Sequence, residues 1–203
     1  MGVVYRGYVT VERDEQRGYE IVRTPNQATV AFLICVSAHA RVPYPHRTRF
    51  DRHDGNVILI TQPRPPMVSP EHPDGAVIDV PGERLDKPHL TIKQHVVEGA
   101  REEVGVRIDD DDLVVVLNDQ RPLSASPGLL TERTYLAYAE VRPDAVAGDQ
   151  EEFGLRKEGE RIKRLIVPAR EFCKMPCETM AAWGLQQWFL RYLHSDDPVG
   201  CFD

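Results

Sequence analysis

The segment LTIKQHVVEGAREEVG, residues 90–105, is the strongest constraint on how this 203-residue chain folds. Its apolar positions follow a partly helical spacing, which predicts a helix. Thr91 is a residue type that caps the start of a helix, and Gly105 stands where a left-handed glycine ends one. Gly99 lies inside this helix at a cost of about 1 kcal/mol relative to alanine, so its presence needs a structural reason.

Strand patterns surround this helix on both sides. Apolar runs typical of buried strands precede it, and further apolar or alternating runs follow it. This order favours a mixed α/β sheet with helices on its faces over a repeated βαβ unit. The predicted strands are ATVAFLICV (28–36), NVILITQPRPP (56–66), AVIDVPG (76–82, ending in a turn), LVVVLND (113–119), TERTYLAYAEV (131–141) and RIKRLIVP (161–168).

The two ends of the chain add further elements. VVYRGYVTVER (3–13) alternates as one strand, and YEIVRT (19–24) returns after a turn. This divides the chain into an N-terminal strand hairpin over 1–27 and a domain over 28–203. AREFCK and CETMAAWGLQQWFLRYLH predict helices near the C-terminus. In the second, a stripe near helical spacing predicts core packing for Met180, Trp183, Trp188, Phe189 and Tyr192.

Charge and composition limit the classes of partner. The formal net charge is −7 and the pI is about 5.5, so a basic nucleic-acid footprint is absent. No signal region and no apolar run of roughly eighteen residues is present, which predicts that the chain does not enter a membrane. Four scattered cysteines favour free thiols in a cytoplasmic protein. An acidic protein binds anionic ligands when a divalent metal bridges them.

Three carboxylates crowd the end of the predicted helix, at Glu98, Glu102 and Glu103. Like charges at i,i+4 destabilise a helix by a few tenths of a kcal/mol, roughly. Either this face is solvated or a cation binds to it. Glu98 and Glu102 share a face, whereas Glu103 lies about 100° further round. His95 is three residues before Glu98; a lone helix histidine is either packed, solvated or close to such a site.

A strand, a glycine turn and a helix ending in Glu-Glu-x-Gly resemble the Nudix family. Its box reads G-x5-E-x7-R-E-U-x-E-E-x-G-U, where U is apolar. Four segments in the same order resemble the ADP-ribose and nucleotide-sugar pyrophosphatases of that family, over roughly residues 28–172. They are ILITQPRPP, DVPGERLD, SASPGLLTERTYLAYAEV and KEGERIKRLIVPAREF. The resemblance implies a Nudix-type α/β/α sandwich.

The box of this chain departs from the family pattern. Aligned back from Gly105, Glu102 and Glu103 match the paired glutamates, but Glu98 stands at the arginine and Gly99 at the first helix glutamate. The box therefore lacks one usual metal ligand and the arginine that braces the site.

The early part of the box departs as well. Glu83 stands at the opening glycine in an ungapped alignment, and His89 or Leu90 at the early glutamate.

The resemblance implies a Mg²⁺ or Mn²⁺ ion that bridges the substrate diphosphate, because hard divalent cations prefer oxygen ligands. Its predicted ligands are Glu102 and Glu103, with Glu98 and the carbonyl of Gly82 as further donors. An acidic loop late in the chain supplies the predicted general base. In that loop Glu160 is the first candidate for the base and Glu158 the second. Glu98, on the predicted helix, is a further candidate. The alternative for the loop carboxylates is that they only solubilise the loop.

The same resemblance assigns substrate contacts. Arg64 either holds a terminal phosphate or ribose or pairs with a surface acid. Pro127 and Gly128 shape a turn at the sugar end of the pocket, or a turn alone. Glu132 either contacts the substrate or forms a surface pair with the next residue, Arg133.

The predicted activity is metal-dependent hydrolysis of a nucleoside diphosphate linked to another group, such as ADP-ribose or a nucleotide sugar. The products are a nucleoside monophosphate and a phosphorylated second product. The alternative is a Nudix-fold nucleotide-binding or regulatory protein without turnover. A third possibility keeps an enzyme with another substrate, contacted by the basic segment ARVPYPHRTRFDRHDG (40–55). The resemblance also implies a homodimer built through the N-terminal hairpin.

Overall fold

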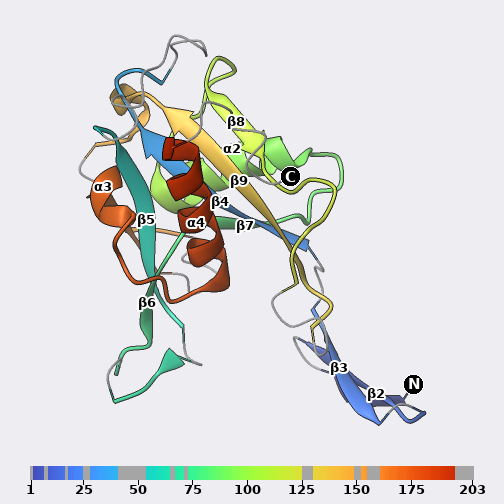
Figure 1. Cartoon of the computed structure of the whole chain (residues 1–203). Coiled ribbons are helices and arrows are strands. Elements are labelled where there is room, and N and C mark those ends of the chain that lie inside the picture. The colour runs from blue at the N-terminus through green and yellow to red at the C-terminus, as the bar shows by residue number, and fades with distance from the viewer. Residues whose placement is uncertain are drawn as a thin grey trace.

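A computed structural model of the chain gives the arrangement of most of its residues (Figure 1). The described strands form a larger eight-stranded sheet and a separate three-stranded sheet. This mixed α/β architecture confirms the predicted fold class. The described residues are 2–6, 9–16, 18–24, 28–40, 54–64, 67–70, 73–124, 130–148, 152–154 and 161–194.

The larger sheet runs in the order β10-β11-β5-β4-β9-β8, with β6 paired to β5 and β7 paired to β4. Its two longest strands, β4 and β9, are parallel, and the other pairings are antiparallel. The strands are β4 Ala28–Val36, β5 Asn56–Pro63, β6 Ala76–Asp79, β7 Gly82–Arg84, β8 Leu113–Val116, β9 Arg133–Val141, β10 Glu152–Phe153 and β11 Ile162–Pro168.

Strand β7 is an element that the sequence analysis missed. The pattern AVIDVPG was predicted as one short strand ending in a turn, whereas the structure continues into a second strand at Gly82. β7 pairs with β4, with Glu83 opposite Val30 and Gly82 opposite Ala31. Three residues are too short a run for any periodicity to reveal, so only the pairing with β4 defines the strand. This pairing holds Glu83 and Gly82 in the sheet next to the central helix.

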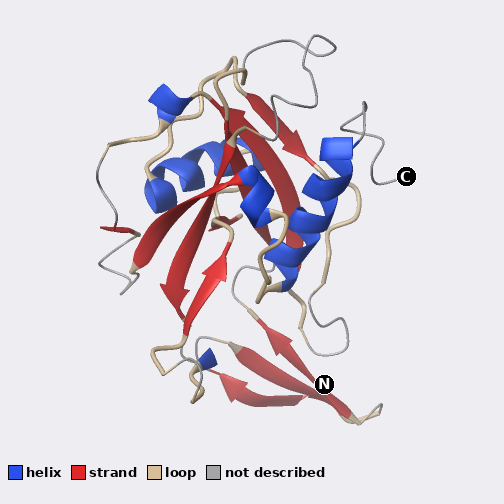
Figure 2. Cartoon of the chain, turned by 60° about the vertical axis from the view of Figure 1, so that its left-hand side comes forward, coloured by secondary structure: helices blue, strands red, loops and turns tan. Residues whose placement is uncertain are grey.

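Alternate side chains of β4 contribute to two cores, one on each face of the sheet. Phe32 and Ile34 pack toward α2 (Ile92–Val104), and Leu33 and Cys35 pack toward α4 (Met180–His194). All four are at most 1% exposed. Figure 2 shows helices on both faces of the sheet, which is an α/β/α sandwich. Burial on both faces explains why β4 is apolar throughout from Val30 to Val36.

Helix α2 begins and ends where the sequence predicts. Thr91 and Gln94 form a capping box, in which each side chain bonds the other residue's backbone N–H. Gly105 ends the helix in the left-handed conformation, with φ 64°, which glycine adopts without steric cost.

The C-terminal helices are α3 (Ala169–Phe172) and the longer α4. The prediction of core packing is correct for Trp188, Phe189 and Tyr192, which are at most 3% exposed. It is wrong for Met180 and Trp183, which are 66% and 54% exposed. Trp183 is five residues before Trp188 and therefore about 140° away around the helix. A short 3-10 helix, η2, spans Pro143–Ala145. Among the described helices, none combines the length and apolarity needed to cross a bilayer.

The N-terminal strands form their own antiparallel sheet, which projects from the body of the molecule (Figures 1 and 2). It comprises β1 (Gly2–Arg6), β2 (Thr10–Asp14) and β3 (Tyr19–Arg23). The prediction of one strand over 3–13 is therefore wrong, because the chain reverses between β1 and β2. Alternation has the same period in one long strand and in two paired strands, so the pattern does not reveal the reversal.

Candidate functional site

A cavity of about 460 Å³ lies between the sheet and the C-terminal half of α2. Its volume is within the range of pockets that hold nucleotide-sized ligands. Arg64 and Arg84 contribute positive charge to its wall. Six carboxyl side chains also line it: Asp79, Glu83, Asp86, Glu102, Glu103 and Glu132. An anionic cavity with this many oxygen donors is suited to a ligand that arrives with a cation.

Glu102 and Glu103, in the last turn of α2, both line this cavity. The backbone N–H of Gly82 donates a hydrogen bond to Oε2 of Glu103 at 2.9 Å. This bond ties β7 to the end of α2 and orients the Glu103 carboxylate. Glu102 has a cationic neighbour on its own helix, with 3.8 Å between its Oε1 and Nη2 of Arg101. The structure thus brings together Glu102, Glu103 and Gly82, the three residues that the sequence analysis assigned to one metal site.

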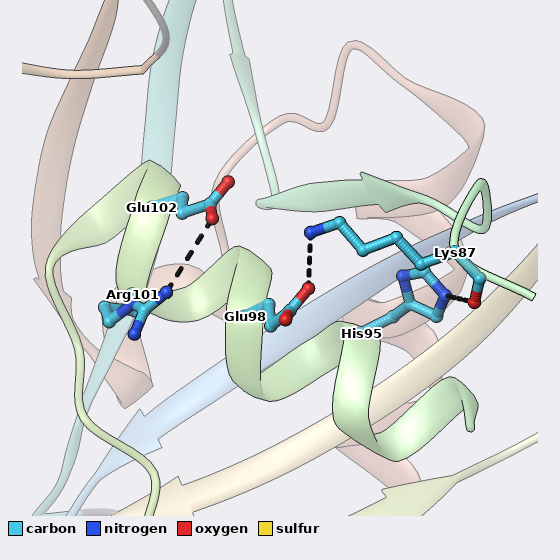
Figure 3. A network of polar contacts seen from close by, with 5 residues as sticks. All are labelled: Lys87, His95, Glu98, Arg101 and Glu102. Atoms are coloured by element: carbon cyan, nitrogen blue, oxygen red, sulfur yellow. Dashed lines mark hydrogen bonds and ion pairs between the residues drawn. The ribbon is translucent and has the colours of Figure 1, made fainter. Parts of the chain in front are cut away.

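Glu98 is in a different environment. Its Oε2 accepts a hydrogen bond from Nζ of Lys87 at 2.5 Å, and the residue is not part of the cavity wall. Figure 3 shows the Lys87 ammonium directed at Glu98, with Glu102 on the following turn. The hydrogen bond from Lys87 lowers the pKa of the Glu98 carboxyl. The structure therefore separates Glu98 from the two glutamates with which the sequence grouped it.

The helix glycine, Gly99, is explained by its neighbours. A Cβ placed on it would lie 3.0 Å from Cβ of Glu83 and 3.2 Å from the ring of Phe32. Contacts of this length are tighter than nine in ten real Cβ contacts, so β7 or β4 would have to shift by a few tenths of an ångström to admit a side chain at this position. The close approach of β7 to α2 thus offsets the intrinsic cost of a glycine inside the helix.

Glu83 is a site residue that the sequence analysis treated only as a departure from a motif. It lines the cavity from β7, opposite Gly99. Burial, and next the negative charge of Glu102, raise the pKa of its carboxyl from the ordinary 4.5 to about 7. A carboxyl group in such an environment is typical of functional sites. Because its position depends on the pairing of β7 with β4, nothing in the local sequence could have identified it.

The predicted substrate contacts are partly described. Arg64 lines the cavity directly after β5, and Glu132 lines it directly before β9. Oγ1 of Thr29 donates a hydrogen bond to Oε1 of Glu132 at 3.4 Å, which links the start of β4 to the start of β9. Four other predicted site residues lie outside the described residues: Pro127, Gly128, Glu158 and Glu160.

Comparisons with known proteins agree on the architecture. No family model matches the sequence, and no curated protein matches it significantly. Two solved structures are similar to this one. One is an ADP compounds hydrolase, with a TM-score of 0.54, 15% identity, and coverage of 94% of this chain and 89% of that one. The other is a mutT/nudix family protein from Listeria innocua, with a TM-score of 0.50, 16% identity, and coverage of 85% and 97%.

The chain has the Nudix fold. Helix α2 carries the segment that the sequence analysis compared with the Nudix box. Gly99 stands where the box pattern has a glutamate, and the space of that missing side chain is taken by Glu83 and Phe32. Glu102 and Glu103 from α2 and Glu83 from β7 are three of the six carboxyl residues that line the cavity. An all-oxygen donor set of this kind fits Mg²⁺ or Mn²⁺.

Proposed function

We propose that this chain is a metal-dependent Nudix-type hydrolase. Its substrate is a nucleoside diphosphate linked to another group, of the ADP-ribose or nucleotide-sugar type, and its products are a nucleoside monophosphate and a phosphorylated second product. The observation that carries this proposal is that Glu102 and Glu103 line the same cavity as Arg64. The similar structure described as an ADP compounds hydrolase supports the substrate class.

The cation would be held by Glu102 and Glu103, with the carbonyl of Gly82 as a further predicted donor. Glu98, predicted from the sequence as a ligand and as a base, is left out because it pairs with Lys87 outside the cavity wall. When bound, Mg²⁺ or Mn²⁺ neutralises the diphosphate and lowers the pKa of a water molecule. The N–H of Gly82 already donates to Glu103 at 2.9 Å. The Glu103 carboxylate is therefore oriented before any ligand binds, which lowers the cost of organising the site.

The remaining residues bind substrate and move a proton. Arg64 lines the cavity, and the planar guanidinium of an arginine suits bidentate contact with phosphate oxygens. A carboxylate of the acidic loop, from Glu160 or Glu158, accepts the proton of the attacking water. Attack forms a new P–O bond in line with the bridging P–O bond that breaks, and the leaving phosphate oxygen departs with the second product.

A second candidate function is nucleotide binding without turnover. It is favoured by the lack of a carboxylate at Gly99 and by the pairing of Glu98 with Lys87. Under this alternative the same cavity binds the nucleotide and the protein acts as a regulatory module.

Turnover of ADP-ribose, ADP-glucose and NADH in Mg²⁺ and in Mn²⁺ distinguishes the two functions. Wild type is compared with Glu103→Gln and with Glu171→Gln, a matched change at an exposed residue of α3. AMP release that needs the metal and collapses only in Glu103→Gln supports the hydrolase. No turnover in either metal, together with nucleotide-induced thermal stabilisation, supports the binding module.

We also propose that the protein is a cytoplasmic homodimer assembled through β1, β2 and β3. Light scattering on the full chain and on a chain that begins at residue 28 tests the dimer. A dimer that persists without the N-terminal sheet would contradict this assembly.

A further inference from the structure

A cluster of metal-ligating side chains joins β7 to the first turns of α2. Two of its members, Glu83 and Asp86, also line the cavity, but the proposed cation ligands Glu102 and Glu103 do not belong to it. Glu83 on β7, Asp86 in the connection and His95 on α2 each offer one ligand atom, and these atoms lie within 4.8 Å of one another. Acidic groups alone gather on many protein surfaces without binding an ion. The histidine is therefore the residue that distinguishes this cluster from an ordinary acidic surface.

The hydrogen bond of His95 determines which of its ring nitrogens is available. Nε2 lies 3.2 Å from the carbonyl oxygen of Lys87. Because a carbonyl only accepts, Nε2 carries the proton, and Nδ1 of the neutral ring carries a free lone pair. Figure 3 shows one ring nitrogen directed at that carbonyl and the other pointing away from it. Metal-binding histidines are commonly held in this way, with the second nitrogen donating to a backbone carbonyl.

The available nitrogen has no partner in the described part of the structure. His95 is 2% exposed, and its Nδ1 is buried without a hydrogen bond. A buried acceptor that bonds neither to protein nor to water is unfavourable unless a ligand satisfies it. The backbone N–H of His95 donates to the carbonyl of Thr91 at 3.0 Å, and Thr91 caps the helix. The ring is therefore attached to a well-defined helix start.

We infer that Glu83, Asp86 and His95 bind a divalent transition-metal ion at a site distinct from Glu102 and Glu103. One imidazole and two carboxylates suit Zn²⁺, Co²⁺ or Mn²⁺, whereas Mg²⁺ and Ca²⁺ prefer oxygen ligands alone. The ammonium of Lys87 donates its hydrogen bond to Glu98 at 2.5 Å, although its charge also acts on Glu83.

The geometry needs only a small adjustment. Metal–ligand bonds of about 2.1 Å place the ligand atoms of a tetrahedral site about 3.4 Å apart. Asp86 is exposed, so its side chain is free to rotate toward the other two ligands, and an ion enters from its side. The bound ion would link β7 to the start of α2 and stabilise the folded state over the unfolded chain.

Cobalt binding in the absence of nucleotide tests the site. Metal-free protein is titrated with Co²⁺ in excess Mg²⁺, which occupies oxygen-only sites, and binding is followed by calorimetry and visible absorption. We expect one Co²⁺ per chain, a higher melting temperature, and no sulfur-to-cobalt charge-transfer band from the cysteines. Asp86→Asn and His95→Gln should weaken binding by roughly tenfold or more. Asp111→Asn, a matched change at another exposed aspartate, should leave it unchanged.

A double variant, Glu102→Gln with Glu103→Gln, separates this site from the proposed catalytic one. It should lose hydrolysis and keep the Co²⁺ site. Absence of Co²⁺ binding to wild type overturns the inference, and so does binding that survives Asp86→Asn but is lost in the double variant. Asp86 is on the surface, so its variant remains informative if His95→Gln fails to fold.

Discussion

The two halves of α2 place the same type of side chain in two different environments. In the last turn, Glu102 and Glu103 line the cavity, and Glu103 accepts a hydrogen bond from Gly82 at 2.9 Å. One turn earlier, Glu98 is bonded to Lys87 at 2.5 Å and is not part of the cavity wall. Strand β7 lies against the helix at Gly99, between these turns. The contact with the sheet, and not the number of glutamates on the helix, determines which carboxylates line the cavity.

The largest expected effect is on hydrolysis. Glu103→Gln should reduce kcat/KM by on the order of a hundredfold or more, because it removes a negative oxygen from the proposed cation site. Glu98→Gln should reduce it by less than about tenfold, because Lys87 already neutralises that carboxylate. Steady-state kinetics in Mg²⁺ compares the two variants. Equal losses would show that the two halves of α2 act together and would place Glu98 in the catalytic set.

The next effect concerns the contact at Gly99. Gly99→Ala should destabilise the protein by about 1–3 kcal/mol, because the new methyl group meets Glu83 and Phe32 in a packed interior. Gly184→Ala in α4 is the matched control, since its Cβ would meet only Leu136, at 3.4 Å. That change should be neutral or stabilising, by up to about 1 kcal/mol. Urea unfolding measures both. A stable Gly99→Ala variant would mean that β7 yields easily and does not divide the helix.

The third effect is a pH dependence of stability. The folded protein holds the proton of Glu83 more tightly than the unfolded chain, because the pKa is raised from 4.5 to about 7. The metal-free protein should therefore lose unfolding free energy as pH rises from 4.5 to 7. Glu83→Gln should remove this loss and be more stable than wild type at pH 8, by on the order of 1 kcal/mol after allowance for solvent screening. Parallel pH profiles for the two proteins would contradict this assignment.

The smallest effect concerns the pair of Lys87 and Glu98. Both side chains are at least 31% exposed, so the pair should add little to stability and lose that contribution in salt. A double-mutant cycle with Lys87→Met and Glu98→Gln, measured in low and high salt, tests this. Strong coupling that persists in high salt would mean that Glu98 is anchored as firmly as Glu103.

Local chemistry explains which parts of the fold were predictable. Thr91 and Gly105 define the ends of α2 through hydrogen bonds and a backbone conformation that involve only near neighbours in the chain. The apolar run of β4 follows from burial on both faces. Core packing was predicted correctly for three of the five stripe residues on α4. Met180 and Trp183 lie off the buried side of this helix, whose orientation depends on the sheet. Chain reversal between β1 and β2 leaves alternation unchanged and was missed.

The sequence by itself determined that α2 ends with Glu102 and Glu103 beside a glycine, since that pattern is contiguous and its consequences are local. Only the tertiary structure decided that Gly99 faces Glu83 and Phe32 at short distance and that Glu83 lines the cavity from β7. It also decided that Nδ1 of His95 is buried without a partner. The physical reason is that each of these features depends on burial and charge from β4, β7 or the connection after β7, which lie next to α2 only once the sheet has formed.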